Sequence, residues 1–334
     1  MKRIAIIGAG NWGTALGLVA ARKGHSVILC GRDPKVVDSI NMEHVNSRYL
    51  PGVILPPSIS ATKSIPKALD GAEFVILAAP SHGTRDLLRM MRFALREHMI
   101  IISATKGIEI ETGKRISEVV ESIMSPVFPS RFVCLSGPSF ASEVVAGHPT
   151  AIVAASRSMK DRELVQSELS FENLRIYANE DVVGTELGGS VKNVMAIAAG
   201  MVTGLGLGTN TVAALITRGL AEMSRLARRQ GGKQETMMGL AGLGDLVLTC
   251  TGDLSRNRHV GVELGKGRSL DEIVNEMNGV AEGVKTALAV HELAYRVVVD
   301  MPITAQVKAV LYDGKSPADA VADLMSRPLR DEVA

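Results

Sequence analysis

Two lysines are the side chains of this sequence best suited to moving a proton. Lys106 follows the apolar run 100–103, at the strand end where open α/β sheets bind their ligands. Lys192 opens an apolar helix, and Met195, Ala196 and Ala199 follow it on its own face. Desolvation among such residues would lower the pKa of a lysine toward the range of an acid–base catalyst. A lysine at a helix start is commonly a surface residue, however, so both interpretations stay open.

Two polar segments of the second half suit the binding of an anionic ligand. Asp245 stands in a glycine-rich run, directly before the apolar residues 246–248, where an acid is commonly a turn residue. The segment Ser255-Arg256-Asn257-Arg258 offers two guanidinium groups and two small hydrogen-bonding side chains. This composition suits a phosphate group, although an ordinary polar loop has the same composition.

The segment Gly8-Ala9-Gly10-Asn11-Trp12-Gly13 matches the G-x-G-x-x-G pattern of dinucleotide-binding turns. It follows the apolar run 3–7 and precedes a helix-like stretch, which is the context that the pattern requires. Gly8 would make the tight turn, Gly10 would let the backbone approach a pyrophosphate, and Gly13 would pack the helix on the strand. The N–H groups at the helix start would attract the negative charge. The alternative is a purely structural turn.

The residues after the second predicted strand bear on the choice between NAD and NADP. An acid there commonly binds the ribose 2′-hydroxyl of NAD, but this chain has Gly31-Arg32-Asp33. The planar guanidinium of Arg32 suits a 2′-phosphate, so we expect NADP(H) to be accepted beside NAD(H), and favoured. The alternative is a solvated Arg32 beside an Asp33 that still binds the hydroxyl.

Short apolar runs alternate with helix-like stretches up to about residue 180, which predicts βαβ units and a doubly wound, mostly parallel sheet. The predicted strands are the segments 3–7, 26–29, 74–77, 100–103, 132–136, 151–154 and 174–177. The predicted helices between them include 13–23, 83–97 and 114–124. We therefore expect a Rossmann-like dinucleotide-binding domain over residues 1–188.

The strand signal fades in the second half, which predicts an all-helical substrate and catalytic domain over residues 189–334. The predicted helices are 191–200, 210–230, 269–277, 285–298, 305–311 and 317–325. The boundary is placed at the glycine pair Gly188-Gly189. The fold class is thus α/β, with a Rossmann-like sheet followed by helices.

Composition excludes several classes of protein. Of 334 residues, 37 are Lys or Arg and 35 are Asp or Glu, so the balanced charge argues against a nucleic-acid-binding surface. The best membrane candidate, residues 194–207, is shorter than a spanning helix and rich in glycine, so we expect no membrane insertion. Three distant cysteines and no paired histidines predict a reducing, cytoplasmic setting and no metal site.

Several motifs in the same order resemble those of the bacterial NAD(P)-dependent sn-glycerol-3-phosphate dehydrogenases, and the resemblance covers nearly the whole chain. Beside the glycine turn, the matching segments are 46–52 (Asn-Ser-Arg-Tyr-Leu-Pro-Gly), 79–82 (Ala-Pro-Ser-His), 104–107 (Ala-Thr-Lys-Gly), 136–141 (Ser-Gly-Pro-Ser-Phe-Ala), 186–193 (Glu-Leu-Gly-Gly-Ser-Val-Lys-Asn), 242–246 (Gly-Leu-Gly-Asp-Leu), 255–257 (Ser-Arg-Asn) and 280–283 (Val-Ala-Glu-Gly).

The resemblance implies roles for the matching positions. Lys192 would be the acid–base residue and would also touch the substrate. The residues implied to bind the cofactor, with the glycines of the turn, are Asn11, Trp12, Arg32, Lys106, Ala141, Arg256, Val280 and Glu282. Those implied to bind the substrate are Lys106, Gly137, Ser139, Asp245, Ser255, Arg256 and Asn257. Ser139 stands where many relatives have threonine, which keeps the hydroxyl group.

The implied reaction reduces dihydroxyacetone phosphate to sn-glycerol 3-phosphate, reversibly, with NADPH or NADH, and supplies glycerophospholipid synthesis. Lys192 would give its proton to the developing alkoxide. Other readings of the two-domain plan are a 6-phosphogluconate-like or 3-hydroxyacyl-CoA-like dehydrogenase, or a non-catalytic NADP sensor. The helical half offers a face for a homodimer, although no decisive apolar stripe marks one.

Overall fold

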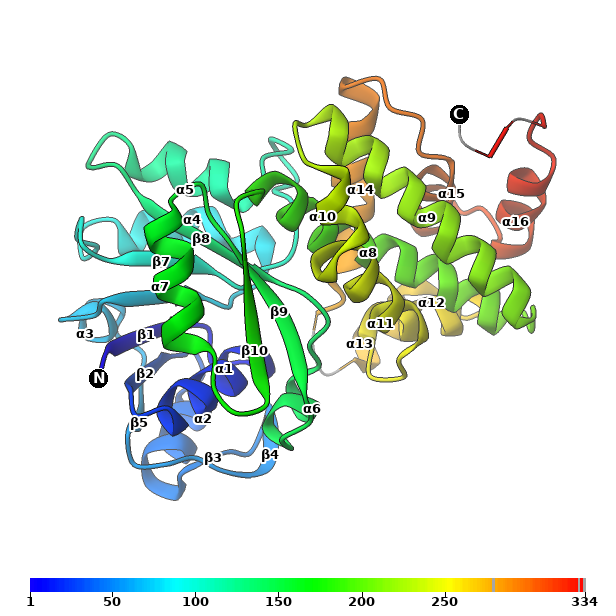
Figure 1. The fold of residues 1–334 in the computed structure, drawn as a ribbon. Helices are drawn as coiled ribbons and strands as arrows, with labels where there is room; N and C mark the ends of the chain where they lie inside the picture. The colour runs from blue at the N-terminus through cyan, green and yellow to red at the C-terminus, as the bar shows by residue number, and fades with distance from the viewer. Residues whose placement is uncertain (278–279, 330, 333–334) are drawn as a thin grey trace.

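The computed structural model describes residues 1–277, 280–329 and 331–332. A sheet with helices on both faces forms the first part of the chain, and a cluster of helices forms the second (Figure 1). The strands are β1 (Arg3–Ile7), β2 (Ser26–Cys30), β3 (Val45–Asn46), β4 (Leu50–Ile54), β5 (Ile59–Thr62), β6 (Phe74–Leu77), β7 (Ile100–Ser103), β8 (Arg131–Ser136), β9 (Thr150–Ala155) and β10 (Leu174–Asn179).

Helices of the first part connect these strands. They are α1 (Asn11–Arg22), α2 (Pro34–Asp38), α3 (Ile65–Leu69), α4 (Thr84–Met91), α5 (Ile116–Met124), α6 (Ala141–Val145) and α7 (Met159–Leu169). The second part contains α8 (Val182–Gly204), α9 (Thr209–Arg229), α10 (Gln234–Met238), α11 (Asp245–Thr251), α12 (Arg256–Gly265), α13 (Leu270–Glu276), α14 (Glu282–Arg296), α15 (Pro302–Tyr312) and α16 (Pro317–Met325). Among the described residues, no helix combines the length and apolar character that crossing a bilayer requires.

The main sheet has eight strands in the order β10-β9-β8-β7-β6-β1-β2-β5, and only the β8–β9 pair is antiparallel. Strands such as β6 and β7 are buried over their whole length, because helices cover both faces of the sheet. This confirms the predicted Rossmann-like, mostly parallel sheet. The chain winds outward from β1 in one direction and from β6 in the other, so the switch point lies between these two strands. Open α/β sheets bind ligands at the carboxyl ends of such strands.

All seven predicted strands are present in the main sheet. The eighth, β5, was not predicted, because Ile-Ser-Ala-Thr is a short edge strand with two polar residues and little apolar signal. The hairpin β3–β4 was also not predicted. Helices account for the described part of the second half, as expected, although α10, α11 and α12 were missed.

Helix α8 begins nine residues earlier than the predicted helix 191–200, at Val182, where Asp181 caps it by accepting from the Gly184 N–H at 2.8 Å. Lys192 therefore lies in the middle of the helix, and the prediction that it opens the helix is wrong. The predicted boundary between residues 188 and 189 falls inside α8, and the division into two domains stays a prediction.

The glycine pair does not end this helix. Instead, both glycines stand where neighbouring segments approach α8 too closely for a side chain. A Cβ at Gly188 would lie 2.4 Å from the carbonyl oxygen of Ala241, and one at Gly189 would lie 2.5 Å from Ser136 Oγ. Ser136 is the last residue of β8. Gly189 thus brings α8 against the carboxyl edge of the sheet, and Gly188 brings it against the segment that precedes Asp245.

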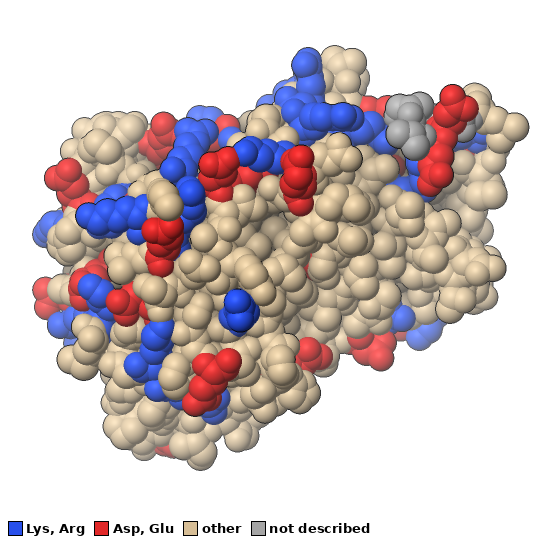
Figure 2. Space-filling model, viewed as in Figure 1, with Lys and Arg blue, Asp and Glu red and all other residues tan. Residues whose placement is uncertain are grey.

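The second part is built around α8, which is buried on nearly all sides by α9, α11, α12 and α14. In Figure 1 these helices surround it, on the side of the sheet where the strands end. The face seen in Figure 2 carries few charges between the two parts, and Lys and Arg residues gather along its upper edge.

Candidate active site

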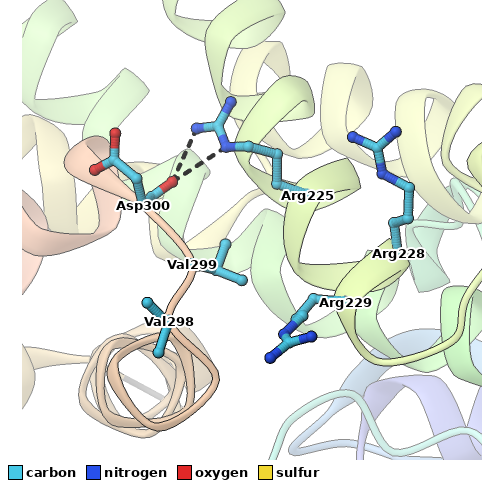
Figure 3. Close-up of a pocket in the computed structure, with 6 residues that line it drawn as sticks. All are labelled: Arg225, Arg228, Arg229, Val298, Val299 and Asp300. Carbon is cyan, nitrogen blue, oxygen red and sulfur yellow. Dashed lines mark hydrogen bonds between the residues drawn. The ribbon is translucent and has the colours of Figure 1, made fainter. Parts of the chain in front are cut away.

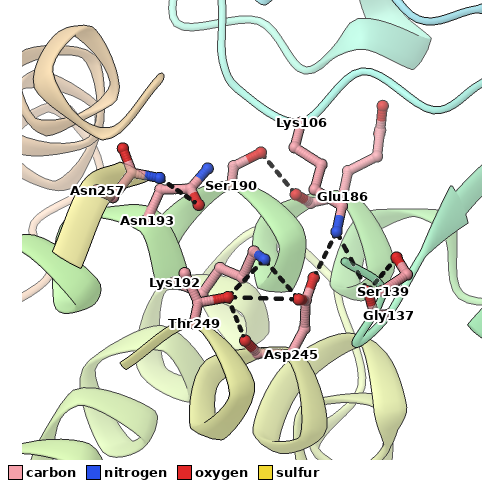
Figure 4. A network of polar contacts seen from close by, with 10 residues as sticks. All are labelled: Lys106, Gly137, Ser139, Glu186, Ser190, Lys192, Asn193, Asp245, Thr249 and Asn257. Carbon is pink, nitrogen blue, oxygen red and sulfur yellow. Dashed lines mark hydrogen bonds and ion pairs between the residues drawn. The ribbon is translucent and has the colours of Figure 1, made fainter. Parts of the chain in front are cut away.

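A buried carboxylate joins two lysines from different parts of the fold (Figure 4). Asp245 is the first residue of α11, and only 1% of the residue is exposed. Its Oδ1 accepts a hydrogen bond from Lys192 Nζ at 2.5 Å, and its Oδ2 accepts one from Lys106 Nζ at 2.7 Å. A charge so deeply buried needs partners of opposite sign, and the two ammonium groups supply them. The alternative reading of Asp245 as a turn residue is therefore wrong.

Lys192 is enclosed by polar partners within an apolar helix. It is 5% exposed, and its Nζ also donates to Thr249 Oγ1 at 2.8 Å. Thr249 in turn donates to the carbonyl oxygen of Asp245 at 2.6 Å. Burial lowers the pKa of Lys192 from 10.5 to about 8; the Asp245 carboxylate opposes this shift, and Lys106 adds to it. The expected desolvation is thus present, and the reading of Lys192 as a surface residue is wrong.

Lys106 extends the network to the end of β8. It lies three residues after β7, and its Nζ donates to the carbonyl oxygen of Gly137 at 3.2 Å. The Ser139 hydroxyl donates to the same oxygen at 3.0 Å. Gly137 has a φ of +139°, and a Cβ there would lie 2.9 Å from Ile152 Cα, so glycine is required for this turn. The turn after β8 therefore presents two of the predicted substrate residues beside Lys106.

The segment predicted to bind a phosphate forms the start of α12. Ser255 caps this helix by accepting from the Arg258 N–H at 3.2 Å, so the alternative of an ordinary polar loop is wrong. The Asn257 side chain donates to Asn193 Oδ1 at 3.0 Å and accepts from the Gly283 N–H at 2.9 Å. Arg256 is exposed at the first turn. Because Asn193 directly follows Lys192, this contact places the start of α12 beside the lysine network.

A second carboxylate connects the helical part with the loop after β6. Glu282, the first residue of α14, accepts from the Ser81 hydroxyl at 2.6 Å and from its N–H at 3.2 Å. Burial raises the pKa of Glu282, while the bonds from Ser81 and the charge of Arg256 oppose the shift. The first turns of α12 and α14 therefore lie close to the sheet edge at the switch point.

The glycine turn has room for a ligand on its outer side. A Cβ at Gly13 would lie 2.0 Å from the carbonyl oxygen of Gly8, so α1 packs directly on the end of β1. A Cβ at Gly10 would meet nothing within 4 Å. Among the described residues no side chain caps α1, so the first N–H groups of this helix have no side-chain acceptor. The arrangement fits the pyrophosphate of a dinucleotide.

The remaining predicted residues lie around this edge. Asn11 is exposed and Trp12 half-buried in the first turn of α1, and Arg32 is exposed two residues after β2. Ala141 opens α6, after the turn that holds Ser139, and Val280 is 40% exposed, just before α14. These residues stand outside the hydrogen-bonded network. Their proposed contacts to a cofactor stay predictions.

Sequence reasoning assigned no role to Thr249, Asn193 or Ser81, which the structure joins to the site. Thr249 stands four residues after Asp245, a spacing that places both on one face of a helix. That signal was hidden because the segment after the glycine-rich run was not predicted to be helical. Asn193 and Ser81 fall within motifs that were recognised, but nothing in their spacing pointed to Asn257 or Glu282.

A hollow of about 410 Å³ lies away from these residues, at the end of α9 (Figure 3). Arg225 donates to the carbonyl oxygen of Asp300 at 3.2 and 3.0 Å, and Arg229 donates to that of Val297 at 2.9 Å. The two arginines thus fasten the connection between α14 and α15. No residue predicted for the active site lines this hollow.

Comparisons with known proteins agree over the full length of the chain. The family model described as NAD-dependent glycerol-3-phosphate dehydrogenase N-terminus matches residues 3–162, and the model of the C-terminus matches residues 181–322. A glycerol-3-phosphate dehydrogenase [NAD(P)+] of Koribacter versatilis is 54% identical over 100% of this chain and 99% of the relative. A glycerol-3-phosphate dehydrogenase [NAD(P)+] of Nitratidesulfovibrio vulgaris is 51% identical over 99% of this chain and 100% of the relative.

A solved structure is similar to the same extent. The crystal structure of glycerol-3-phosphate dehydrogenase from Coxiella burnetii superposes with a TM-score of 0.94 at 41% sequence identity. The match covers 98% of this chain and 99% of that one. Both halves of the fold are therefore shared.

Proposed function

The chain belongs to the NAD-dependent glycerol-3-phosphate dehydrogenase family, and we propose that it reduces dihydroxyacetone phosphate to sn-glycerol 3-phosphate through the Lys192 network. It is an NAD(P)-dependent oxidoreductase. The observation that carries the proposal is the buried Lys192–Asp245–Lys106 network. It supports acid–base chemistry at the carboxyl edge of a dinucleotide-binding sheet, where a carbonyl can be held beside a nicotinamide.

Substrate binding divides between two ends of the site. Arg256, exposed at the start of α12, would pair with the phosphate of the substrate, and Ser255 and Asn257 would complete its surroundings. The carbonyl end would lie toward Lys106 and Lys192. Gly137 and Ser139 would border this end from the turn after β8. This orientation places the charge of the phosphate away from the buried carboxylate of Asp245.

Lys192 would act as the acid of the reduction and as the base of the reverse reaction. Bound NADPH or NADH supplies the hydride, for which Gly8, Gly10, Gly13 and the first turn of α1 offer the binding site. With a pKa of about 8, Lys192 is mostly protonated near neutral pH, yet it loses its proton far more readily than an ordinary lysine. Asp245 and Thr249 would keep Nζ in place and stabilise the ammonium form.

Three further features belong to the proposal. We place the protein in the cytoplasm, where its product would supply glycerophospholipid synthesis. The three buried, free cysteines are compatible with a reducing compartment. A homodimer formed through the helical part is proposed as its assembly, to be tested by light scattering.

Absorbance of NADPH at saturating cofactor tests the function directly. The purified protein should oxidise NADPH with dihydroxyacetone phosphate, and should not do so without substrate. It should not reduce NADP+ with 6-phosphogluconate, which separates it from the dehydrogenase of that sugar acid. If the protein binds NADPH but does not oxidise it when any ketone phosphate is added, the proposal is overturned in favour of a non-catalytic sensor.

A further inference from the structure

The turn between β3 and β4 places an arginine on the acid that follows β2. Arg48 Nη1 donates to Asp33 Oδ2 at 2.7 Å, while Asp33 Oδ1 accepts from the Lys35 N–H at 2.9 Å and so caps α2. The bond from Lys35 and the pairing with Arg48 both lower the pKa of Asp33, which stays ionised. Both oxygens of this carboxylate therefore already have donors.

The same turn is fastened to the glycine turn. Asn46 is completely buried, and its Nδ2 donates to the carbonyl oxygen of Ala9 at 3.0 Å and to Thr14 Oγ1 at 2.8 Å. Its Oδ1 accepts from the Tyr49 N–H at 3.2 Å. The Arg48 guanidinium lies 5.3 Å from the centroid of the Tyr49 ring, which packs on the core. Asn46 thus holds the segment that carries Arg48 against the glycine turn.

We propose that Arg48 determines the preference for NADPH over NADH, by occupying the Asp33 carboxylate that would otherwise bind a ribose 2′-hydroxyl and repel a 2′-phosphate. The inference rests on the proposed function, since it concerns the same cofactor site. An acid at this end of β2 selects for the hydroxyl. Here two guanidinium groups, those of Arg32 and Arg48, stand with one carboxylate, so the local charge is positive. An ion pair with an arginine whose side chain is 62% exposed adds little to folding stability.

Fluorescence titration of NADPH and NADH without substrate tests this inference in four proteins. They are the unaltered chain, Arg48→Ala, Asp33→Asn and the double variant. Asparagine at position 33 can still cap α2, so Asp33→Asn removes only the charge of the side chain. We expect Arg48→Ala to weaken NADPH binding roughly tenfold, because the uncovered Asp33 carboxylate then repels the 2′-phosphate, and to leave NADH binding unchanged or tighter. Adding Asp33→Asn should restore most of the NADPH affinity.

Two outcomes would overturn the inference. Equal weakening of both cofactors by Arg48→Ala would mean that the arginine only supports the fold. Weakened NADPH binding that Asp33→Asn fails to restore would mean direct contact with the phosphate instead of masking of the acid. Arg89→Ala is the matched control, because Arg89 forms a similarly exposed pair with Asp86 on α4 and should change neither affinity. Since no substrate is present, these results stand whether or not the protein reduces dihydroxyacetone phosphate.

Discussion

The pH dependence of turnover should follow the protonation of Lys192. With a pKa of about 8, about three quarters of its side chains are protonated near pH 7.5 and about one tenth near pH 9. An ordinary lysine would still be almost fully protonated there. Reduction needs the ammonium form, so its kcat should fall about tenfold per pH unit above this midpoint. Oxidation of sn-glycerol 3-phosphate needs the neutral amine, and its kcat should rise through the same midpoint.

Removing the charge of Asp245 should move this midpoint down. The carboxylate oxygen lies 2.5 Å from Lys192 Nζ and opposes the effect of burial. A close opposite charge is worth about 1–3 pKa units, so Asp245→Asn should shift the midpoint to roughly pH 5–7. Near pH 8 the protonated fraction would then drop from about one half to between about one tenth and one thousandth.

Stopped-flow or steady-state NADPH oxidation at saturating substrate, followed above pH 7, gives the reduction profile of the unaltered chain and of Asp245→Asn. The unaltered chain should show its midpoint in this range, and the variant should show only a falling limb. Using kcat separates the protonation of Lys192 from weaker substrate binding in the variant. Asp86→Asn is the control, since Asp86 is exposed on α4 and pairs only with Arg89 among the described contacts. An Asp245→Asn midpoint that stays in place or moves up would refute the reasoning, as would reduction that accelerates with rising pH.

Substitutions at the proposed site should separate its roles. Lys192→Ala should lower kcat roughly 10²- to 10⁴-fold in a folded protein that still binds NADPH by fluorescence; near-normal turnover would contradict the acid–base role. Arg256→Ala should mainly raise the KM for dihydroxyacetone phosphate, and an unchanged KM would argue against a phosphate site there. Gly10→Ala should weaken NADPH binding at an unchanged Tm, because its Cβ meets no protein atom. Gly13→Ala should cost about 1–3 kcal/mol of unfolding free energy by overpacking against Gly8; equal Tm values for the two glycine variants would show that the packing argument fails.

The sheet could be predicted because burial on both faces leaves a strong local signal. Apolar runs mark the strands between the two edges of the main sheet. The edge strand β10 alternates buried and exposed residues, and the edge strand β5 is short and half polar. Helix ends were less predictable. The glycines at 188 and 189 look like a break in sequence, yet they mark close contacts of α8, with Ala241 and with the sheet edge at Ser136.

The contacts of the active site could not be predicted from spacing. Lys106 and Asp245 are 139 residues apart, and Lys192 and Asp245 are 53 apart. Each residue alone has an ordinary alternative, as a surface lysine or a turn acid. Only the order of motifs, shared with a known family, pointed to all three together. The start of α11 was also hidden, because the glycine-rich run before it is typical of a loop.

Burial gives the network both its reactivity and its dependence on the whole fold. Lys192 can lose a proton near neutral pH because the helices packed around α8 shield it from water, and it stays charged enough to act because Asp245 lies beside it. Asp245 in turn needs Lys106, which comes from the sheet and not from the helical part. Two ammonium groups against one carboxylate leave a positive charge at the proposed position of the carbonyl. Such a charge stabilises an oxygen that becomes negative as hydride arrives, and it exists only where the two parts of the chain are packed together.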